Sequence, residues 1–290
     1  MTLSRAKDRA IQYARLMRFH RPIGILLLLW PTLWAVWIAA EGHPEPAIVV
    51  IFVLGVFVMR SAGCIINDFA DRKFDPHVER TRDRPIAAGK VTPTEALVLF
   101  FILCAVAFGL VLMLNTRTIL LSFVAISLAA SYPFMKRFTH LPQVHLGLAY
   151  GCAAPMAFAA QTDTIPPVAW LIAITIVLWV VAHDTIYALL DRPDDLRIGV
   201  KSSAILFGNA DKMVIAGIQM AVLLILLIIG EKAGLGIYYY LGIAAAAVLG
   251  LYQQRLIRTR QPNNYFRAFL NNNWFVAVIF AGIYLHYCCG

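Results

Sequence analysis

The chain has 290 residues, of which 60% are hydrophobic and 14% charged, and its net charge is +9. Soluble domains average about 45–50% apolar and about 25% charged residues, so this composition excludes a soluble globular protein. Intrinsic disorder is excluded too, because apolar residues at this density collapse. The five cysteines form no framework of disulfides or zinc ligands, and all five are interpreted as packing residues.

Nine apolar segments are long enough to cross a bilayer as helices. A hydrocarbon core of about 30 Å requires about 20 apolar residues per helix. In chain order the predicted spans are 22–40, 46–66, 94–114, 117–134, 141–161, 167–190, 213–230, 235–254 and 270–287. The sequence therefore predicts an all-α membrane protein, in which residues 1–290 form a single integral domain of nine transmembrane helices.

The basic residues predict how these helices are oriented. Residues 1–21 carry six Arg and Lys and are predicted to form an amphipathic cytoplasmic segment; the apolar run after them is too long for a signal peptide. With this segment in the cytoplasm, 22 of the 25 Lys and Arg lie on that side, while Arg117 and Lys232 lie outside. The positive-inside rule thus predicts a cytoplasmic N-terminus and a periplasmic C-terminus. The charge of +9 requires no nucleic acid to explain it.

Seven of the 16 acidic residues fall in two short stretches at the cytoplasmic ends of predicted helices. The first stretch holds Asn67, Asp68, Asp71 and Asp75, and the second holds Asp184, Tyr187, Asp191, Asp194 and Asp195. In each stretch three residues recur at intervals of four, which on a continuing helix places them on one face. Because the two sets are offset by 120 residues, the chain is predicted to contain two weak parallel repeats.

The acidic stretches predict a metal site for a phosphorylated ligand. Carboxylates stacked on one helical face repel each other, and a cation between the two stretches would remove that cost. Oxygen ligands without Cys or His favour magnesium, which keeps open positions for a phosphate. Neighbouring Lys and Arg suit the remaining oxygens of a diphosphate. The alternative interpretation is that these acids are ordinary solvated loop charges. The repeated spacing of the two stretches argues against it. The segments 67–93 and 191–212 are therefore predicted to be cytoplasmic catalytic loops.

Arg60 lies well inside the predicted helix 46–66. It precedes Asn67 by seven residues, so it lies on nearly the same face and about 10.5 Å deeper in the bilayer. Ionisable residues at such depth usually face a cavity and serve function. The alternative is a side chain that snorkels to the interface. The functional interpretation is an anion receptor below the metal site, suited to a carboxylate.

Two acidic motifs and three further stretches of this chain are similar to those of one known family. The motifs are Asn67-Asp68-x-x-Asp71-x-x-x-Asp75 and Tyr187-x-x-x-Asp191-x-x-x-Asp195, and the stretches are Arg21 to Gly24, Tyr132 to Arg137 and Gly199 to Ser202. With these features the chain resembles the UbiA family of intramembrane aromatic prenyltransferases, and the likeness covers nearly its whole length. His183 departs from the family pattern, where close members have Tyr.

The resemblance implies a UbiA-type fold with a central cavity and a magnesium-dependent enzyme. The expected reaction transfers a polyprenyl group from a polyprenyl diphosphate to the carbon ortho to the hydroxyl of 4-hydroxybenzoate, in ubiquinone biosynthesis. Two magnesium ions would bridge the diphosphate, held by Asn67, Asp71, Asp75, Asp184, Asp191 and Asp195. The residues expected to contact the diphosphate are Arg80, Arg84, Tyr132, Lys136 and Lys201. Arg60 would hold the acceptor's carboxylate, and Asp68, Tyr187 and Asp194 would support the site. The residues expected to be catalytic are Asp71, Asp75, Asp191, Asp195 and Arg60.

Two alternatives stay open at this point. Another acceptor, such as naphthoate, homogentisate or protohaem, would use the same metal site. The non-enzymatic alternative is a transporter. Transporter sites lie near the midplane of the bilayer, whereas these acids gather at the cytoplasmic ends of the helices. The expected location is the bacterial inner membrane, with the active site facing the cytoplasm. The sequence leaves open the prenyl chain length, the base that deprotonates the ring and the oligomeric state.

Overall fold

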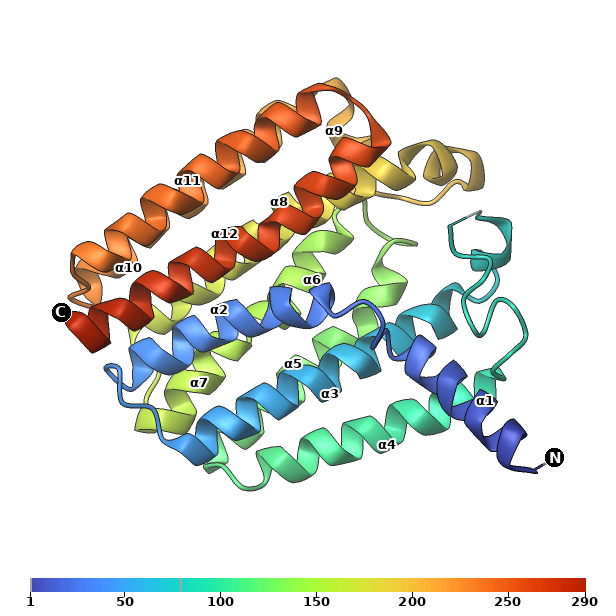
Figure 1. Ribbon diagram of the computed structural model, residues 1–290, viewed down its shortest axis with the longest axis horizontal. Helices are drawn as coiled ribbons and strands as arrows, with labels where there is room; N and C mark the ends of the chain where they lie inside the picture. The colour runs from blue at the N-terminus through green and yellow to red at the C-terminus, as the bar shows by residue number, and fades with distance from the viewer. Residues whose placement is uncertain (1, 79) are drawn as a thin grey trace.

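The computed structural model describes residues 2–78 and 80–290, and in these ranges every regular element is helical (Figure 1). The α-helices are α1 (Thr2–Leu16), α2 (Ile23–Ala39), α3 (Pro46–Asp71), α4 (Pro93–Val111), α5 (Thr116–Met135), α6 (Pro142–Gly151), α7 (Ala153–Thr162), α8 (Pro167–Ile198), α9 (Ser203–Phe207), α10 (Asp211–Lys232), α11 (Ile237–Arg258) and α12 (Pro262–Cys289). Two short 3-10 turns are η1 (Asp75–His77) and η2 (Gly208–Ala210). The prediction of an all-α chain is confirmed.

Each predicted apolar segment forms helix, but the fifth segment, 141–161, is divided. It forms α6 and α7, which are separated at Cys152. Pro155 has no N–H to donate to the carbonyl of Gly151 four residues earlier, and its ring crowds that carbonyl. The helix is therefore interrupted where the proline removes its hydrogen bond.

Many large apolar side chains lie on the outer surface of the bundle. In the part of the chain that the structure describes, six helices are long and apolar enough to cross a bilayer, namely α3, α4, α5, α8, α10 and α12. Their exposed residues include Phe101 on α4 and Leu120 and Phe123 on α5. Such a surface is unfavourable in water and suits hydrocarbon, and helices satisfy their own backbone groups there. The chain is a multi-pass membrane protein.

The six long helices are fewer than the nine predicted spans. Of the other three segments, α2 has 17 residues, the fifth is divided into two helices of ten, and α11 carries four tyrosines and two glutamines among its 22 residues. The predicted span at 270–287 is longer than expected, because α12 already begins at Pro262.

Polar side chains join several helices inside the bundle. The consecutive asparagines at 271–273 on α12 accept hydrogen bonds from three different helices. The donors are Gln253 on α11, Trp179 on α8 and Trp30 on α2, at 3.0, 3.1 and 2.9 Å. A buried amide or indole N–H without a partner is costly in an apolar interior, so these bonds fix how α12 lies against its neighbours.

The two acidic stretches lie at the same end of the bundle, and they differ in local structure. The first was predicted to continue as one helix through Asp75, and that prediction is wrong. α3 ends at Asp71 and Asp75 belongs to the separate turn η1; Pro76 has no N–H to donate to the carbonyl of Arg72, so the α-helix does not continue through it. In the second stretch, α8 continues through Pro193 to Ile198 and ends at Gly199, whose φ is +73°. The predicted loops 67–93 and 191–212 are thus partly helical.

Figure 1 shows the N-terminus at the end of the bundle that carries α9 and the 72–92 segment. The C-terminus lies at the opposite end, where α12 finishes. Termini at opposite ends of the bundle require that the chain passes from end to end an odd number of times. The two acidic stretches, together with α1, therefore share one end of the molecule.

Candidate active site

Both acidic stretches line one small cavity of about 210 Å³. The sequence-predicted residues that line it are Asn67, Asp71, Asp75, Arg80, Arg84, Tyr132, Lys136, Asp184, Tyr187, Asp191, Asp194, Asp195 and Lys201. They come from the end of α3, the segment after it, the end of α5 and the last turns of α8. Helices that are distant in sequence therefore bring the acids and bases of both halves to one place.

Carboxylates of the first stretch face basic side chains. Lys136, which follows α5, forms an ion pair with Asp71. Arg84 donates to both oxygens of Asp75 at 3.1 and 3.0 Å. Burial raises the pKa of the Asp75 carboxyl above its ordinary value, while Arg84 beside it acts to lower that pKa. The first stretch is thus an acid–base network and not a row of free carboxylates.

Arg80 connects the first half of the chain to the second. Its Nη2 forms an ion pair with Asp191 Oδ2 on α8 at 2.5 Å, and its Nη1 donates to the Tyr187 hydroxyl. The guanidinium carbon also lies 4.7 Å from the centre of the Tyr187 ring, a cation–π distance. The segment after α3 is therefore held against the acidic face of α8 across the small cavity.

Asp68 is almost completely buried, with 1% of its surface exposed. It accepts hydrogen bonds from Arg18 Nη2 at 2.8 and 3.1 Å and forms an ion pair with Arg84 Nη1 at 3.2 Å. The sequence indicates Arg18 only as one of the basic residues that orient the N-terminal segment. Arg18 reaches Asp68 from the turn between α1 and α2, where its φ is +62°. No pattern in the sequence signals this contact, because the two residues meet only after α1 folds over α3.

Two predicted site residues make contacts outside the acid–base network. Lys201 Nζ donates to the carbonyl of Phe138 at 3.2 Å, so it ties the segment after α8 to the segment after α5. Asp194 pairs at 3.8 Å with Arg197, whose side chain is largely exposed. Both residues still line the small cavity.

The donor set of the small cavity fits a divalent cation that prefers oxygen. Across residues 2–78 and 80–290, no three His, Cys, Asp or Glu side chains already converge as a metal site. Asp71, Asp75 and Asp191 pair instead with basic side chains. However, Asp71 Oδ1 is buried without a hydrogen-bond partner among the described residues. An orphaned carboxylate oxygen is costly, and a hard cation such as magnesium would satisfy it.

A larger cavity of about 890 Å³ adjoins the small one. The residues that line both are Asn67, Arg80, Thr81, Arg84, Tyr132, Asp184 and Tyr187. Much of the remaining wall is apolar and is formed by Leu27, Phe52, Leu110, Leu114, Leu146 and Met156. The molecule thus contains a charged chamber that adjoins a larger cavity with a mostly apolar wall.

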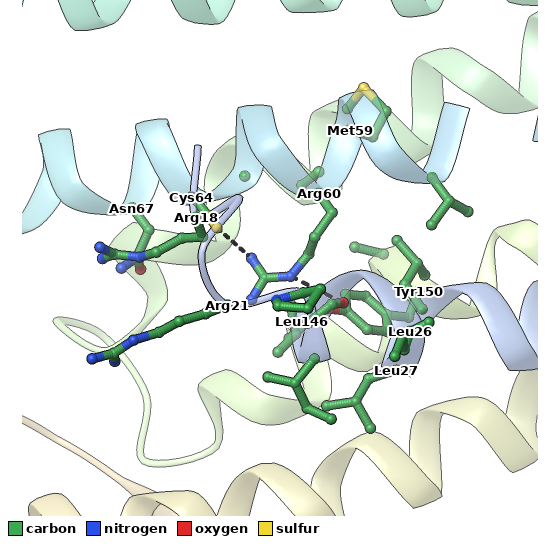
Figure 2. Close-up of a pocket in the computed structure, with 18 of the residues that line it drawn as sticks. Arg18, Arg21, Leu26, Leu27, Met59, Arg60, Cys64, Asn67, Leu146 and Tyr150 are labelled. Atoms are coloured by element: carbon green, nitrogen blue, oxygen red, sulfur yellow. Dashed lines mark hydrogen bonds between the residues drawn. The ribbon is translucent and has the colours of Figure 1, made fainter. Parts of the chain in front are cut away.

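Arg60 and His183 lie in the wall of the large cavity. His183 is buried, its Nδ1 lies 3.1 Å from the carbonyl of Trp179, and its ring stacks on the Trp179 indole with centroids 4.3 Å apart. Figure 2 shows Arg60 extending from α3 toward α2, with Arg18 and Arg21 on one side of the guanidinium and Tyr150 on the other. The guanidinium therefore lies between the charged and the apolar parts of the cavity.

Arg60 is held by two groups that sequence analysis missed. Its Nε donates to the carbonyl of Gly24 at 3.2 Å, and its Nη1 lies 2.8 Å from Cys64 Sγ (Figure 2). The sequence alone predicts a packing role for Cys64. It follows Arg60 by four residues on α3, which is the spacing at which helical side chains meet, so this contact had a signal in the sequence.

Comparisons with known proteins agree with this architecture. Residues 28–279 match the UbiA prenyltransferase family. The chain is 63% identical over 281 residues to a 4-hydroxybenzoate octaprenyltransferase of Nitrosococcus oceani, covering 97% of this chain and 99% of that protein. A protein of the same name from Alkalilimnicola ehrlichii is 59% identical over 285 residues, covering 98% of this chain and 97% of the relative.

Solved structures share the fold. The apo structure of a UbiA homologue from Aeropyrum pernix K1 superposes with a TM-score of 0.80 at 25% identity, covering 89% of this chain and 96% of that one. A UbiA homologue from Archaeoglobus fulgidus bound to GPP and Mg²⁺ gives 0.73 at 18% identity, covering 94% and 99%. From the family match, the full-length relatives and the shared fold together, the chain belongs to the UbiA prenyltransferase family.

Proposed function

We propose that this protein transfers a polyprenyl group from a polyprenyl diphosphate to the carbon ortho to the hydroxyl of 4-hydroxybenzoate, as a step of ubiquinone biosynthesis. The observation that carries the proposal is a charged chamber, lined by acids and bases, that adjoins a larger cavity with a mostly apolar wall. A prenyl diphosphate has the same division into a charged head and an apolar tail. The names of the relatives support this acceptor and an octaprenyl donor.

The proposed setting is the bacterial inner membrane. Nine crossings result when α2, α11 and the pair α6 and α7 are each counted as one span beside the six long helices. The N-terminus then lies in the cytoplasm and the C-terminus in the periplasm, in agreement with the distribution of Lys and Arg. The small cavity opens toward the cytoplasm, where the water-soluble acceptor and the released diphosphate are found.

The proposed residues for the diphosphate surround the small cavity. Asn67, Asp71, Asp75, Asp184, Asp191 and Asp195 would hold two magnesium ions. When bound, magnesium neutralises diphosphate oxygens and so favours departure of the leaving group. In this structure Lys136, Arg80 and Arg84 pair with carboxylates. When the diphosphate binds, these side chains give up part of those contacts and bind the diphosphate oxygens instead. Tyr132 and Lys201 complete the lining of the chamber.

The proposed chemistry follows from this placement. Basic side chains stabilise the negative charge that develops on the diphosphate as the allylic C–O bond breaks. The resulting allylic cation forms a C–C bond with the ring carbon ortho to the hydroxyl, and the ring then releases its proton. Arg60 holds the acceptor's carboxylate so that this carbon faces the cation. The apolar wall excludes water, which would otherwise capture the cation.

The test is product formation by the purified full-length protein in lipid. Labelled 4-hydroxybenzoate, a prenyl diphosphate and magnesium are expected to give a prenylated product that keeps its carboxylate. EDTA is expected to stop its formation, and excess magnesium to restore it. Parallel reactions contain naphthoate, homogentisate or protohaem with the same donor. Product with one of these acceptors alone would contradict the assigned acceptor, and no product with any acceptor would contradict prenyl transfer.

A further inference from the structure

The guanidinium of Arg60 is fixed in one orientation by α2 and by its own helix. Gly24 belongs to the first turn of α2, and its carbonyl accepts from Arg60 Nε at 3.2 Å. One turn along α3, the sulfur of Cys64 lies 2.8 Å from Nη1. Gly24 and Cys64 are both buried, and all three residues line the large cavity. Figure 2 shows the two contacts on different sides of the guanidinium.

These contacts use only part of the hydrogen-bonding capacity of Arg60. A guanidinium has five N–H groups, and here one goes to a carbonyl and one to a thiol. Nη2 has no hydrogen-bond partner among the residues that the structure describes. Three N–H groups therefore remain for a ligand in the cavity. A planar group with two adjacent free N–H groups matches the two oxygens of a carboxylate.

The absence of a side chain at position 24 is what allows this orientation. A Cβ added to Gly24 would lie 2.6 Å from Arg60 Nη2, 2.7 Å from Nε and 2.9 Å from Cζ. These distances are shorter than nonbonded atoms tolerate. The colliding atoms are the far end of a flexible side chain, so the protein can fold with alanine there. The guanidinium would then have to leave its place.

We propose that Gly24 and Cys64 are positioning residues for the acceptor, which hold the guanidinium of Arg60 so that its free N–H groups face the acceptor's carboxylate. This inference rests on the proposed function, because it requires Arg60 to bind that carboxylate. Gly24 provides the space and a carbonyl acceptor on α2. Cys64 provides an acceptor on the opposite side, and together the two contacts prevent rotation of the guanidinium plane.

The test is steady-state kinetics of the full-length protein in lipid, with the acceptor and the prenyl diphosphate varied separately. The variants are Gly24→Ala, Cys64→Ala and Cys64→Ser. Gly217→Ala is the matched control, because Gly217 is a helical glycine on α10 with nothing within 4 Å of an added Cβ, and it lines neither cavity. Arg60→Ala and the double variant Gly24→Ala with Arg60→Ala complete the set.

Gly24→Ala is expected to raise KM for 4-hydroxybenzoate by about tenfold or more, the effect of loosening one hydrogen bond to a charged group. The KM for the prenyl diphosphate and kcat should change little, since only acceptor binding is weakened. Cys64→Ala should likewise raise KM for 4-hydroxybenzoate. Cys64→Ser should retain most of the acceptor affinity, because a hydroxyl also accepts from Nη1. Gly217→Ala should have the same kcat and the same KM for both substrates as the unaltered protein.

The double variant separates positioning from a general effect on structure. If Gly24 acts through Arg60, Gly24→Ala will have no further effect on KM once Arg60 is alanine. An equal rise in both backgrounds, or no rise in either, would overturn the inference while leaving prenyl transfer intact. Absence of product from the unaltered protein would instead overturn the proposed function, and this inference with it.

Discussion

Loss of the buried Asp68 carboxylate is expected to destabilise the protein much more than loss of an exposed ion pair of similar length. Asp68→Ala removes the partner of Arg18, whose Nη2 lies 2.8 Å from it, and one of two partners of Arg84. Breaking a buried ion pair costs about 3–5 kcal/mol. Because Arg84 keeps its contact with Asp75 at 3.0 Å, the lower value of about 3 kcal/mol is expected for the free energy of unfolding.

The control is the Arg9–Glu95 pair, which is shorter, at 2.5 Å, but has 49% of the Arg9 side chain exposed. Arg9→Ala should lower the free energy of unfolding far less, because water and salt screen exposed ion pairs. The assay is denaturant titration in detergent micelles, followed by tryptophan fluorescence. Equal destabilisation by Asp68→Ala and Arg9→Ala would refute the reasoning, since it would mean that burial does not decide the strength of these pairs.

Three further outcomes are expected. Asp71→Ala and Asp191→Ala should each abolish turnover while the protein remains in the membrane fraction, because each removes a carboxylate of the charged chamber; substantial product from either would contradict its role at the metal site. Arg60→Ala should raise KM for the acceptor more than KM for the prenyl diphosphate, and the opposite pattern would exclude the carboxylate role. Asn272→Leu leaves the buried indole N–H of Trp179 unpaired, so it should lower the free energy of unfolding by about 1–3 kcal/mol in the same titration; an unchanged midpoint would mean that another group satisfies the indole.

The helices were largely predictable because their cause is local. An apolar run of about 20 residues has few alternatives to a helix in a bilayer, where backbone groups must pair within the segment. The departures also have local causes. Pro155 divides the fifth segment and Pro76 ends the first acidic helix, whereas α8 continues through Pro193. Whether a helix survives a proline depends on neighbouring groups that compensate the lost bond, and sequence spacing does not contain them.

The site was predictable where residues share a motif. Acids at matched helix ends were expected to converge, and the structure places both stretches on one cavity. The contacts of Arg18 with Asp68 and of Gly24 with Arg60 were not predictable, since they join the turn after α1, and α2, to α3 through tertiary packing alone. A glycine in particular carries no chemical signature, and its importance becomes visible only when the neighbouring atoms are known.

The three asparagines at 271–273 have a mechanical consequence for the cavity. A slide or rotation of α12 would break its bonds to α2, α8 and α11 together, so this helix resists displacement from three directions. The residues just before them, Phe266, Phe269 and Leu270, line the large cavity. These bonds therefore act to hold the backbone of this wall in place, and the volumes of the three side chains contribute to the dimensions of the chamber on this side.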